Sequence, residues 1–394
     1  MTAQQSPEKR RAFLKTAGGL LLLKPATVFG SQANSAITLG IIGCGGRGNY
    51  VGGLFKEFTG ARITALHDPF RAAIDATIAK QQLSNPRTYT GLDGYRDLIT
   101  SDVDAVAVMS PPYWHPEQAA AAIAAGKPVY IAKPVAVDVH GCLSFRATGR
   151  RAAARNLSLW TDFQTRSQSA FQEAAARVHR GDIGDLVLGH IYYHAGRLQR
   201  RDAPGLSPAE HRLRNWMFDK AISGDVIVEQ NIHVIDVANW YANTHPVAAV
   251  GTGGRKARVD VGDCWDHFLV QFDYPDGVKV DFSSAQFTKG YSDLCMRFYG
   301  SLGTVDSHYR GVVRITGDNP WEGAEENTMD VGTKSNIRQF TASIREGEPI
   351  NNADVTVESN LSAVLGRMAA YGRRPVTWDE MIASDEKLEA HLAL

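Results

Sequence analysis

The sequence predicts two joined domains of different class, a doubly wound α/β domain followed by an α+β domain. Short apolar runs alternate with helical stretches between 37 and about 165, and the first of these runs ends in a glycine-rich turn. From about 187 the pattern changes to longer alternating runs. Alternating strands and helices are typical of a parallel sheet of the Rossmann type, whereas the later pattern indicates a large open antiparallel sheet.

The first strand, expected at 37–42, leads directly into the sequence GCGGRG, and a helix is expected from 50 onward. This is the G-x-G-x-x-G pattern between a strand and a helix. The first glycine permits the tight turn, the second lets the backbone approach a pyrophosphate, and the helix N-terminus offers free N–H groups to it. The predicted cofactor-binding residues of this turn are Gly43, Gly45, Gly46, Arg47 and Gly48.

A second strand at 62–66 ends just before Asp68, which follows Gly48 by 20 residues. A carboxylate at that distance is expected to accept hydrogen bonds from the adenosine ribose of a dinucleotide. It would repel a 2′-phosphate, so NAD is favoured over NADP. Arg71 is close enough in sequence to soften this preference, and NADP therefore remains an alternative.

Further strands are expected at 104–109, 129–132 and 157–162, with an alanine-rich helix at 116–125. Ligands of such sheets bind beyond the carboxyl ends of the strands. Six further candidates for cofactor contact lie at or just after these ends: Ser110, Pro111, His115, Lys133, Gln164 and Arg166. We expect His115 to pack beneath the nicotinamide end of the cofactor.

In the second half, strands are expected at 186–193, 247–251, 265–272, 278–285, 295–299 and 312–316. The turn sequence YPDG at 274–277 predicts a hairpin. Helices at 336–346 and 355–367 are expected to return to the first domain. We therefore divide the chain into a leader at 1–33, a first domain at 34–165 and a second domain at 166–394.

One helix, expected at 224–241, carries candidate chemistry. Glu229 and His233 are spaced i,i+4 and share a face, and Asp236 lies i+3 from His233. A carboxylate beside an imidazole would set its tautomer and tune its basicity. The alternative is a solvated helix face with an ordinary i,i+4 pair.

The N-terminal 33 residues read as a targeting segment rather than as part of the fold. The sequence KRRAFLK at 9–15 precedes a weakly apolar patch at 17–23, and SQA at 31–33 offers small residues for cleavage. Paired arginines before such a patch favour the twin-arginine route, which exports folded proteins to the periplasm. The alternative is an amphipathic first helix with a basic end.

Charge and cysteine content exclude several functions. Lysine plus arginine and aspartate plus glutamate both number 42, so no basic surplus points to nucleic acid. No apolar run reaches the roughly 20 residues that a membrane span needs. The four cysteines form no C-x-x-C pair, and we expect buried thiols. Acidic residues and a histidine at 260, 263, 266 and 267 match no ligand spacing, so no metal is expected.

These motifs together resemble the Gfo/Idh/MocA family of sugar and polyol oxidoreductases, over about residues 37–380. The resemblance rests on GIIGCGGRG at 40–48, Asp68, the segment 104–111 with His115, GKPVYIAKP at 126–134, Gln164 with Arg166, and EQNIHVID at 229–236. Together with the leader, it extends to the periplasmic glucose-fructose-oxidoreductase-like proteins.

The resemblance implies hydride transfer between NAD(P) and a CH–OH group of a carbohydrate or polyol. It implies Lys133, His233 and Glu229 as catalytic residues. Lys133 would bond the reacting oxygen and shuttle its proton. His233 would act as general base, or share that role with Lys133 through the substrate hydroxyl, and Glu229 would hold a neighbouring hydroxyl. By the same analogy, the substrate-binding residues are Lys133, Arg166, Tyr192, Arg197, Asn215, Trp216, Gln230 and His233. A homo-oligomer, dimeric or tetrameric, is also implied.

Two positions depart from the family pattern. The family motif is Glu-Lys-Pro, but Ala132 precedes Lys133 here, and Glu229 stands where the family usually has Asp. An exported enzyme meets no NAD pool, so the leader favours a tightly bound, internally recycled cofactor. Two alternatives stay open: a redox-neutral glycoside hydrolase or lyase that transiently oxidises C3 of its sugar, and a sugar-binding protein without turnover.

Overall fold

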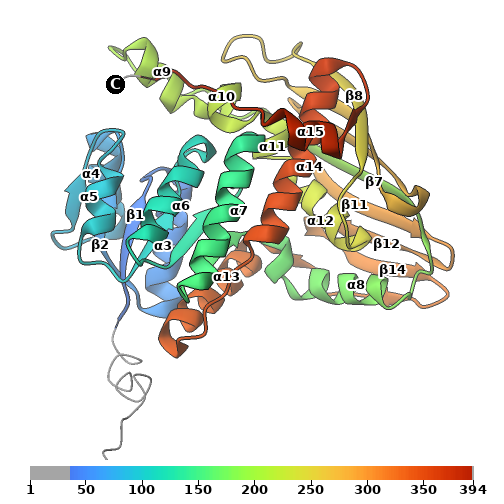
Figure 1. Cartoon of the computed structure of the whole chain (residues 1–394), viewed down its shortest axis with the longest axis horizontal. Coiled ribbons are helices and arrows are strands. Elements are labelled where there is room, and N and C mark those ends of the chain that lie inside the picture. The colour runs from blue at the N-terminus through green and yellow to red at the C-terminus, as the bar shows by residue number, and fades with distance from the viewer. Residues whose placement is uncertain (1–35, 393–394) are drawn as a thin grey trace, which may run out of the picture.

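The computed structural model describes residues 36–392 (Figure 1). The predicted leader at 1–33 lies outside these described residues. Within them, no helix is both long enough and apolar enough to cross a membrane. All four cysteines are buried and free, as expected.

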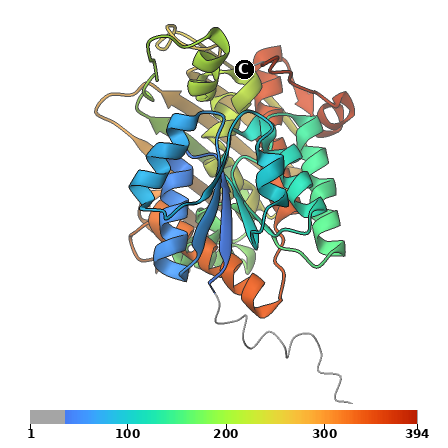
Figure 2. The ribbon, with the colours of Figure 1, turned by 90° about the vertical axis from the view of Figure 1, so that its left-hand side faces the viewer.

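The first domain is a six-stranded parallel sheet in the order β3-β2-β1-β4-β5-β6. Figure 2 shows this sheet with helices on both faces. Its strands are β1 Thr38–Ile42, β2 Arg62–His67, β3 Arg87–Tyr89, β4 Ala105–Val108, β5 Val129–Ala132 and β6 Leu159–Asp162. Its helices are α3 Gly46–Thr59, α4 Arg71–Gln81, α5 Tyr95–Thr100, η1 Pro112–Trp114, α6 His115–Ala124 and α7 Val139–Ala154. The predicted doubly wound fold is confirmed.

The second domain is built on a nine-stranded sheet in the order β15-β14-β12-β11-β7-β10-β9-β8-β17. All neighbouring strands pair antiparallel except β7 and β10, which run parallel, so the expected antiparallel sheet is in detail a mixed one. Its strands are β7 Leu186–Ala195, β8 Ala248–Gly254, β9 His267–Asp273, β10 Lys279–Gln286, β11 Asp293–Gly300, β12 Gly303–His308, β14 Val313–Gly317, β15 Trp321–Glu322 and β17 Val376–Thr377. The predicted hairpin joins β9 to β10 through η4 Pro275–Gly277.

Helices cover one face of this sheet, and side chains alternate accordingly. In β9, Phe268, Val270 and Phe272 are buried, whereas Leu269 and Gln271 are exposed. The remaining elements are η2 Thr165–Ser167, α8 Ser169–His179, α9 Pro208–Arg214, η3 Trp216–Phe218, α10 Lys220–Ser223, α11 Val226–Glu229, α12 Ile232–Ala242, β13 Arg310–Gly311, β16 Glu326–Asn327, α13 Thr328–Glu346, α14 Ala353–Gly372 and α15 Trp378–Ser384.

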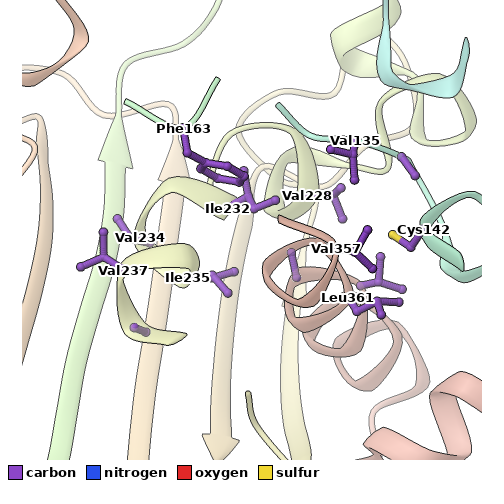
Figure 3. Close-up of a cluster of buried hydrophobic side chains, with 14 of the residues drawn as sticks. Val135, Cys142, Phe163, Val228, Ile232, Val234, Ile235, Val237, Val357 and Leu361 are labelled. Atoms are coloured by element: carbon purple, nitrogen blue, oxygen red, sulfur yellow. The ribbon is translucent and has the colours of Figure 1, made fainter. Parts of the chain in front are cut away.

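One hydrophobic core joins the two sheets. Helix α14 packs on α7 on one side and on β8 and β9 on the other, and α13 packs on α3. Figure 3 shows side chains of this core, among them Val135, Phe163, Ile232 and Leu361. The continuous core fixes the carboxyl ends of β5 and β6 relative to the segment that carries Glu229 and His233.

That segment is not the single helix that its sequence predicts. Helix α11 ends at Glu229 and α12 begins at Ile232, so a turn at Gln230 separates them. The Gln286 side chain donates to Oε1 of Gln230 at 2.6 Å, which ties this turn to β10. Buried apolar residues lie on both sides of the break, and their periodicity therefore gave no sign of it.

Candidate active site

The glycine-rich turn has the backbone geometry that its sequence predicts. Gly43 adopts φ +96°, and its N–H donates to the carbonyl of His67 at 2.8 Å. A Cβ on Gly48 would overlap the carbonyl oxygen of Gly43, so only glycine lets α3 start this close to the turn. A Cβ on Gly45 or Gly46 would meet no atom within 4 Å, because these residues face open space.

Asp68 follows β2 and lies beside this turn. Its Oδ2 accepts the N–H of Cys44 at 2.9 Å, and its Oδ1 accepts the N–H of Phe70 at 2.9 Å. Burial raises the pKa of the Asp68 carboxyl, while these two backbone bonds and the charges of His67 and Arg214 act in the opposite direction. Arg71 pairs instead with Asp75 at 2.9 Å.

A cavity of about 310 Å³ opens above the turn, and we call it the adenosine-side cavity. Residues of the first domain form most of its wall: Gly43, Gly45, His67, Asp68, Pro69, Phe70, Ala72, Ala73, Leu92, Met109, Ser110, Pro111, Trp114 and Gln118. The segment that carries α9 contributes Arg201, Leu213, Arg214 and Trp216. Neither Arg201 nor Arg214 was among the sequence candidates.

A second cavity of about 210 Å³ shares part of this wall and reaches the ends of β5 and β6; we call it the catalytic-side cavity. It is lined by Gly45, Gly46, Arg47, Met109, Ser110, Pro112, Ala132, Lys133, Asp162, Gln164, Arg201, Trp216, Met217 and Glu229. Of the predicted site residues, the structure thus brings together the glycine turn, Ser110, Lys133, Gln164, Trp216 and Glu229.

Lys133 is held by the turn after α11. Its Nζ donates to the carbonyl of Glu229 and lies 3.3 Å from Oε1 of the same residue. Both side chains are largely buried, with 15% and 11% exposed. The carboxylate that the family motif places before the lysine is missing at Ala132, and Glu229 supplies one from the other domain.

His233 is buried near this pair, and its Nδ1 has no hydrogen-bond partner within the described part of the chain. Burial lowers the pKa of His233 well below its ordinary value, and the charges of Lys133 and Arg47 lower it further. The imidazole is therefore in its neutral form, in which one ring nitrogen carries a free lone pair. The Tyr309 ring lies 5.2 Å from it, centre to centre.

The expectation that Asp236 would orient His233 is wrong. Both carboxylate oxygens of Asp236 accept from Nε of Arg166 at 2.9 Å, and Ser359 donates to Oδ1 at 2.7 Å. The break between α11 and α12 does not explain this, because both residues lie in α12. Asp236 is fully buried and turns to the nearest cation, Arg166, which lines neither cavity. Arg166 thus ties α12 to the segment that follows β6 at the boundary between the two domains.

A polar network missed by the sequence analysis lies at the end of β6. Asp162 forms an ion pair with Arg47 and accepts from Asn336 at 3.0 Å. Gln164 accepts from the Tyr309 hydroxyl at 3.1 Å. The signal available for Asp162 was its place at a strand end, next to Gln164. For Tyr309 there was none, because it lies between β12 and β13 of the second domain, far along the chain from Gln164 and outside any motif.

Four further predicted substrate residues line neither cavity, and the same is true of His233. Tyr192 is on the outer face of the nine-stranded sheet, where its hydroxyl donates to Asp293 at 2.8 Å. Strand alternation turns the next residue, Tyr193, toward the interior. Burial raises the pKa of its hydroxyl, and the negative charge of Glu229 raises it further. Arg197 pairs with Asp260 on the surface.

The side chains of Asn215 and Gln230 form hydrogen bonds within the second domain. Asn215 bonds backbone groups, and Gln230 bonds a side chain of β10. Asn215 accepts the N–H of Arg201 at 2.8 Å and donates to its carbonyl at 3.0 Å. Gln230 accepts from Gln286, as described above. Both were expected by analogy with the family, which did not show the direction of their side chains in this chain.

His115 connects the two loops that border the cavities. Its Nε2 lies 2.8 Å from the carbonyl of Ser110 and its Nδ1 lies 2.7 Å from that of Pro134. Burial lowers the pKa of His115 to about 4. The side chain is fully buried and lines neither cavity, so it fixes the loops of Ser110 and Lys133 relative to each other.

The acidic residues near 260 do not meet at one point. Asp266 accepts three backbone N–H groups of residues 256–258, and Asp263 accepts that of Lys220. In the described part of the chain, the one group with metal-ligand spacing is Cys295, Asp306 and His308. Asp306 there already pairs with Arg297 and Arg314, whose positive charges oppose a cation.

The two joined cavities fit a dinucleotide. Gly45 lines both of them, and a Cβ there would project into their shared space. Asp68 lies at the end that the ribose of an adenosine would occupy in this fold. The free N–H groups at the start of α3 lie between the two cavities, where a pyrophosphate would lie.

Comparison with known proteins agrees with this geometry. Residues 37–158 match a model described as an oxidoreductase family with an NAD-binding Rossmann fold, and residues 171–306 match the GFO/IDH/MocA C-terminal domain. The chain is 28% identical over 264 residues to an inositol 2-dehydrogenase of Ralstonia nicotianae, which spans 66% of this chain and 70% of that protein. It is 28% identical over 235 residues to a glycosyl hydrolase family 109 protein of a Shewanella species, over 52% of this chain and 49% of that protein.

Among solved structures, scyllo-inositol dehydrogenase from Lactobacillus casei with bound NAD(H) and scyllo-inositol has the same fold. The TM-score is 0.69 at 18% identity, over 88% of this chain and all of that one. The two family models together cover more than half of the chain. The chain therefore belongs to the GFO/IDH/MocA family of oxidoreductases, and its first domain is an NAD-binding Rossmann domain.

Proposed function

We propose that the protein transfers a hydride between NAD and a CH–OH carbon of a sugar or polyol, with Lys133, His233 and Glu229 as the catalytic residues. The observation that carries this proposal is the position of Lys133. Its ammonium group lies at the end of β5, in the cavity that continues from the glycine turn, and Glu229 of the other domain holds it there.

NAD, when bound, would accept the hydride from the CH–OH carbon of the substrate. The hydroxyl proton of the substrate must leave as its C–H hydride does, and a buried neutral imidazole can accept it. His233 offers a neutral imidazole, because burial keeps its pKa low, and its Nδ1 has no partner in the described chain. Lys133 would bond the substrate oxygen and stabilise negative charge on it as the proton moves to His233. Trp216 offers an apolar face for the sugar ring.

We further propose that the cofactor stays bound and is recycled internally. Two observations support this: residues of the second domain line the adenosine-side cavity, and the leader predicts export to the periplasm, where no NAD pool exists. The same leader supports membership among the periplasmic glucose-fructose-oxidoreductase-like proteins. Asp68 favours NAD over NADP.

The test begins with purified full-length protein. We expect denaturation to release nicotinamide cofactor in a near-stoichiometric amount. Holoprotein mixed with myo-inositol, scyllo-inositol or common hexoses should then show the near-ultraviolet absorbance of reduced nicotinamide, and Lys133→Met should abolish it. A protein that binds these compounds without any absorbance change, in every case, would contradict the proposal and leave a sugar-binding protein.

A second candidate function is favoured by the similarity to a glycosyl hydrolase family 109 protein, which covers 52% of this chain and 49% of that protein. In this alternative, the sugar is oxidised at C3, and the aglycone leaves C1 as the C2 proton is lost. In a hydrolase water then adds to the C1–C2 double bond, and in either case the C3 ketone is reduced again by the same cofactor. Aryl glycosides distinguish the two. Release of the aryl group without net change in reduced nicotinamide supports the redox-neutral route, whereas net reduction without release supports the dehydrogenase.

The oligomeric state is also a proposal. Leu188, Val250, Leu269 and Tyr299 are exposed on the sheet face that turns away from the helices. Burying such a face against a second copy would remove apolar surface from water. We expect a dimer or tetramer in solution, and light scattering after gel filtration measures this; Leu269→Asp should shift it toward the monomer.

A further inference from the structure

A segment of the second domain extends over the first domain. Residues 196–223 leave the end of β7 and carry α9, η3 and α10, and Figure 1 shows α9 above the ends of α4 and α5. Arg201, Leu213, Arg214 and Trp216 of this segment line the adenosine-side cavity. A dinucleotide in that cavity would therefore touch both domains.

Arg214 brings a positive charge to the cavity. Its guanidinium carbon lies 4.5 Å from the centre of the Phe70 ring, and Phe70 follows the predicted ribose carboxylate, Asp68, by two residues. The Nε of Arg214 is buried and has no hydrogen-bond partner in the described part of the chain. Arg71, the cation expected there from the sequence, is 62% exposed, pairs with Asp75 and lines neither cavity.

The position of Arg214 depends on contacts outside its own helix. Helix α9 has only seven residues, which is too short to be stable alone, although Ser207 and Glu210 form a capping box at its start. The Asn215 side chain bonds both backbone groups of Arg201 and so joins the stretch before α9 to the residue that follows this helix. These bonds put Arg201 and Arg214 on the same wall of the cavity.

The C-terminal tail, residues 385–392, fastens this segment to the first domain. The N–H of Leu388 donates to Oδ2 of Asp138, the residue that caps α7, at 2.7 Å. Two residues later, the carbonyl of Ala390 accepts from Nη1 of Arg212 in α9 at 3.0 Å. Figure 1 shows the end of the chain running beside α10 toward α9. The tail thus joins α7 to the helix that carries Arg214.

We propose that residues 201–216 form a clasp that holds the adenosine half of the cofactor, with Arg214 as a cofactor contact and the C-terminal tail as its fastening. This inference rests on the proposed retention of NAD and explains it. Release requires the clasp to lift, which breaks the contact of Arg214 with Phe70 and the bond of Arg212 with Ala390. Dissociation is slow for that reason.

The test measures release directly rather than activity. Holoprotein is loaded with NADH and mixed with a large excess of NAD, and the loss of bound-nicotinamide fluorescence gives the dissociation rate. Arg214→Ala should dissociate about tenfold faster, as expected for the loss of one charge-assisted contact. A chain that ends at Glu386 should also release NADH faster. The matched control, Arg71→Ala, should release it at the wild-type rate.

Equal release rates in wild type, Arg214→Ala and the shortened chain would overturn the clasp. If the shortened chain does not fold, Arg212→Ala replaces it, since this change also removes the bond to Ala390. A wild-type protein that loses its cofactor during mixing would instead contradict retention. The clasp is then judged from equilibrium titration with NADH, and an unchanged dissociation constant in Arg214→Ala would overturn it.

Discussion

Gly45→Ala separates the folding role of the glycine turn from its binding role. Gly45 lines both cavities, and a Cβ at this position would meet no protein atom within 4 Å. Its backbone is extended at φ −75°, which alanine adopts without strain. The added methyl group therefore leaves the fold intact but takes space where the backbone must approach a pyrophosphate. Overpacking of this kind costs about 1–3 kcal/mol, which corresponds to roughly 5- to 140-fold weaker binding.

The assay is titration of the cofactor-free protein with NADH, together with thermal unfolding without cofactor. We expect the dissociation constant to rise by that factor, while the free energy of unfolding falls by less than about 1 kcal/mol, the cost of alanine at a helix N-cap. Gly48→Ala is the contrasting variant, because its Cβ would overlap the Gly43 carbonyl and destabilise the fold itself. Unchanged NADH affinity in Gly45→Ala would refute the placement of the pyrophosphate at this turn.

Three further predictions concern the catalytic side and the domain junction. Lys133→Met should lower kcat by about 10²- to 10³-fold, the usual effect of removing one donor that stabilises developing negative charge, with NADH affinity changed only a few-fold; a loss below threefold in steady-state kinetics would contradict its role. Because burial and the charges of Lys133 and Arg47 depress the pKa of His233, its imidazole should stay neutral as pH falls below the ordinary value of about 6.5; NMR titration that finds protonation at or above that value would disprove this. Arg166→Met leaves the buried Asp236 carboxylate without a cation and should cost about 3–5 kcal/mol in urea unfolding; a loss below about 1 kcal/mol would mean that the pair does not hold the junction.

The fold was largely predictable because its signals are local. Apolar runs of the right length placed five of the six strands of the parallel sheet, and glycines marked the turn before α3. The short strand β3, Arg87–Tyr89, has no apolar run and gave no signal. The parallel pairing of β7 with β10 was also missed, since pairing of strands distant in sequence leaves no local pattern.

The site was less predictable because the direction of a side chain depends on tertiary contacts. Tyr192 and Tyr193 are neighbouring residues of the same type, so the sequence alone does not tell them apart. The register of β7 shows that Tyr193 is the one that turns inward. Asp236 lies one helical turn from His233, yet a buried carboxylate pairs with whichever cation the packing brings near. Arg214 reaches the cavity through a clasp whose position is fixed by the end of the chain.

The structure explains why Lys133 can lack the glutamate that the family motif places before it. Sequence reasoning treated Ala132 and Glu229 as two separate departures from the family pattern. In the structure, the side chain of Glu229 reaches Lys133 from the other domain, with Oε1 at 3.3 Å from Nζ. The lysine therefore keeps an anionic partner, and that partner now depends on domain packing.

Isotope transfer tests the central claim most directly. Under single-turnover conditions, holoprotein is mixed with an inositol or hexose that carries deuterium on its CH–OH carbons. The cofactor is then extracted, and its mass is measured by mass spectrometry. Hydride transfer predicts reduced nicotinamide that carries one deuterium from the substrate. In the redox-neutral route the same label enters the cofactor transiently and returns to the product. Cofactor that never acquires deuterium while the substrate is converted would contradict the account.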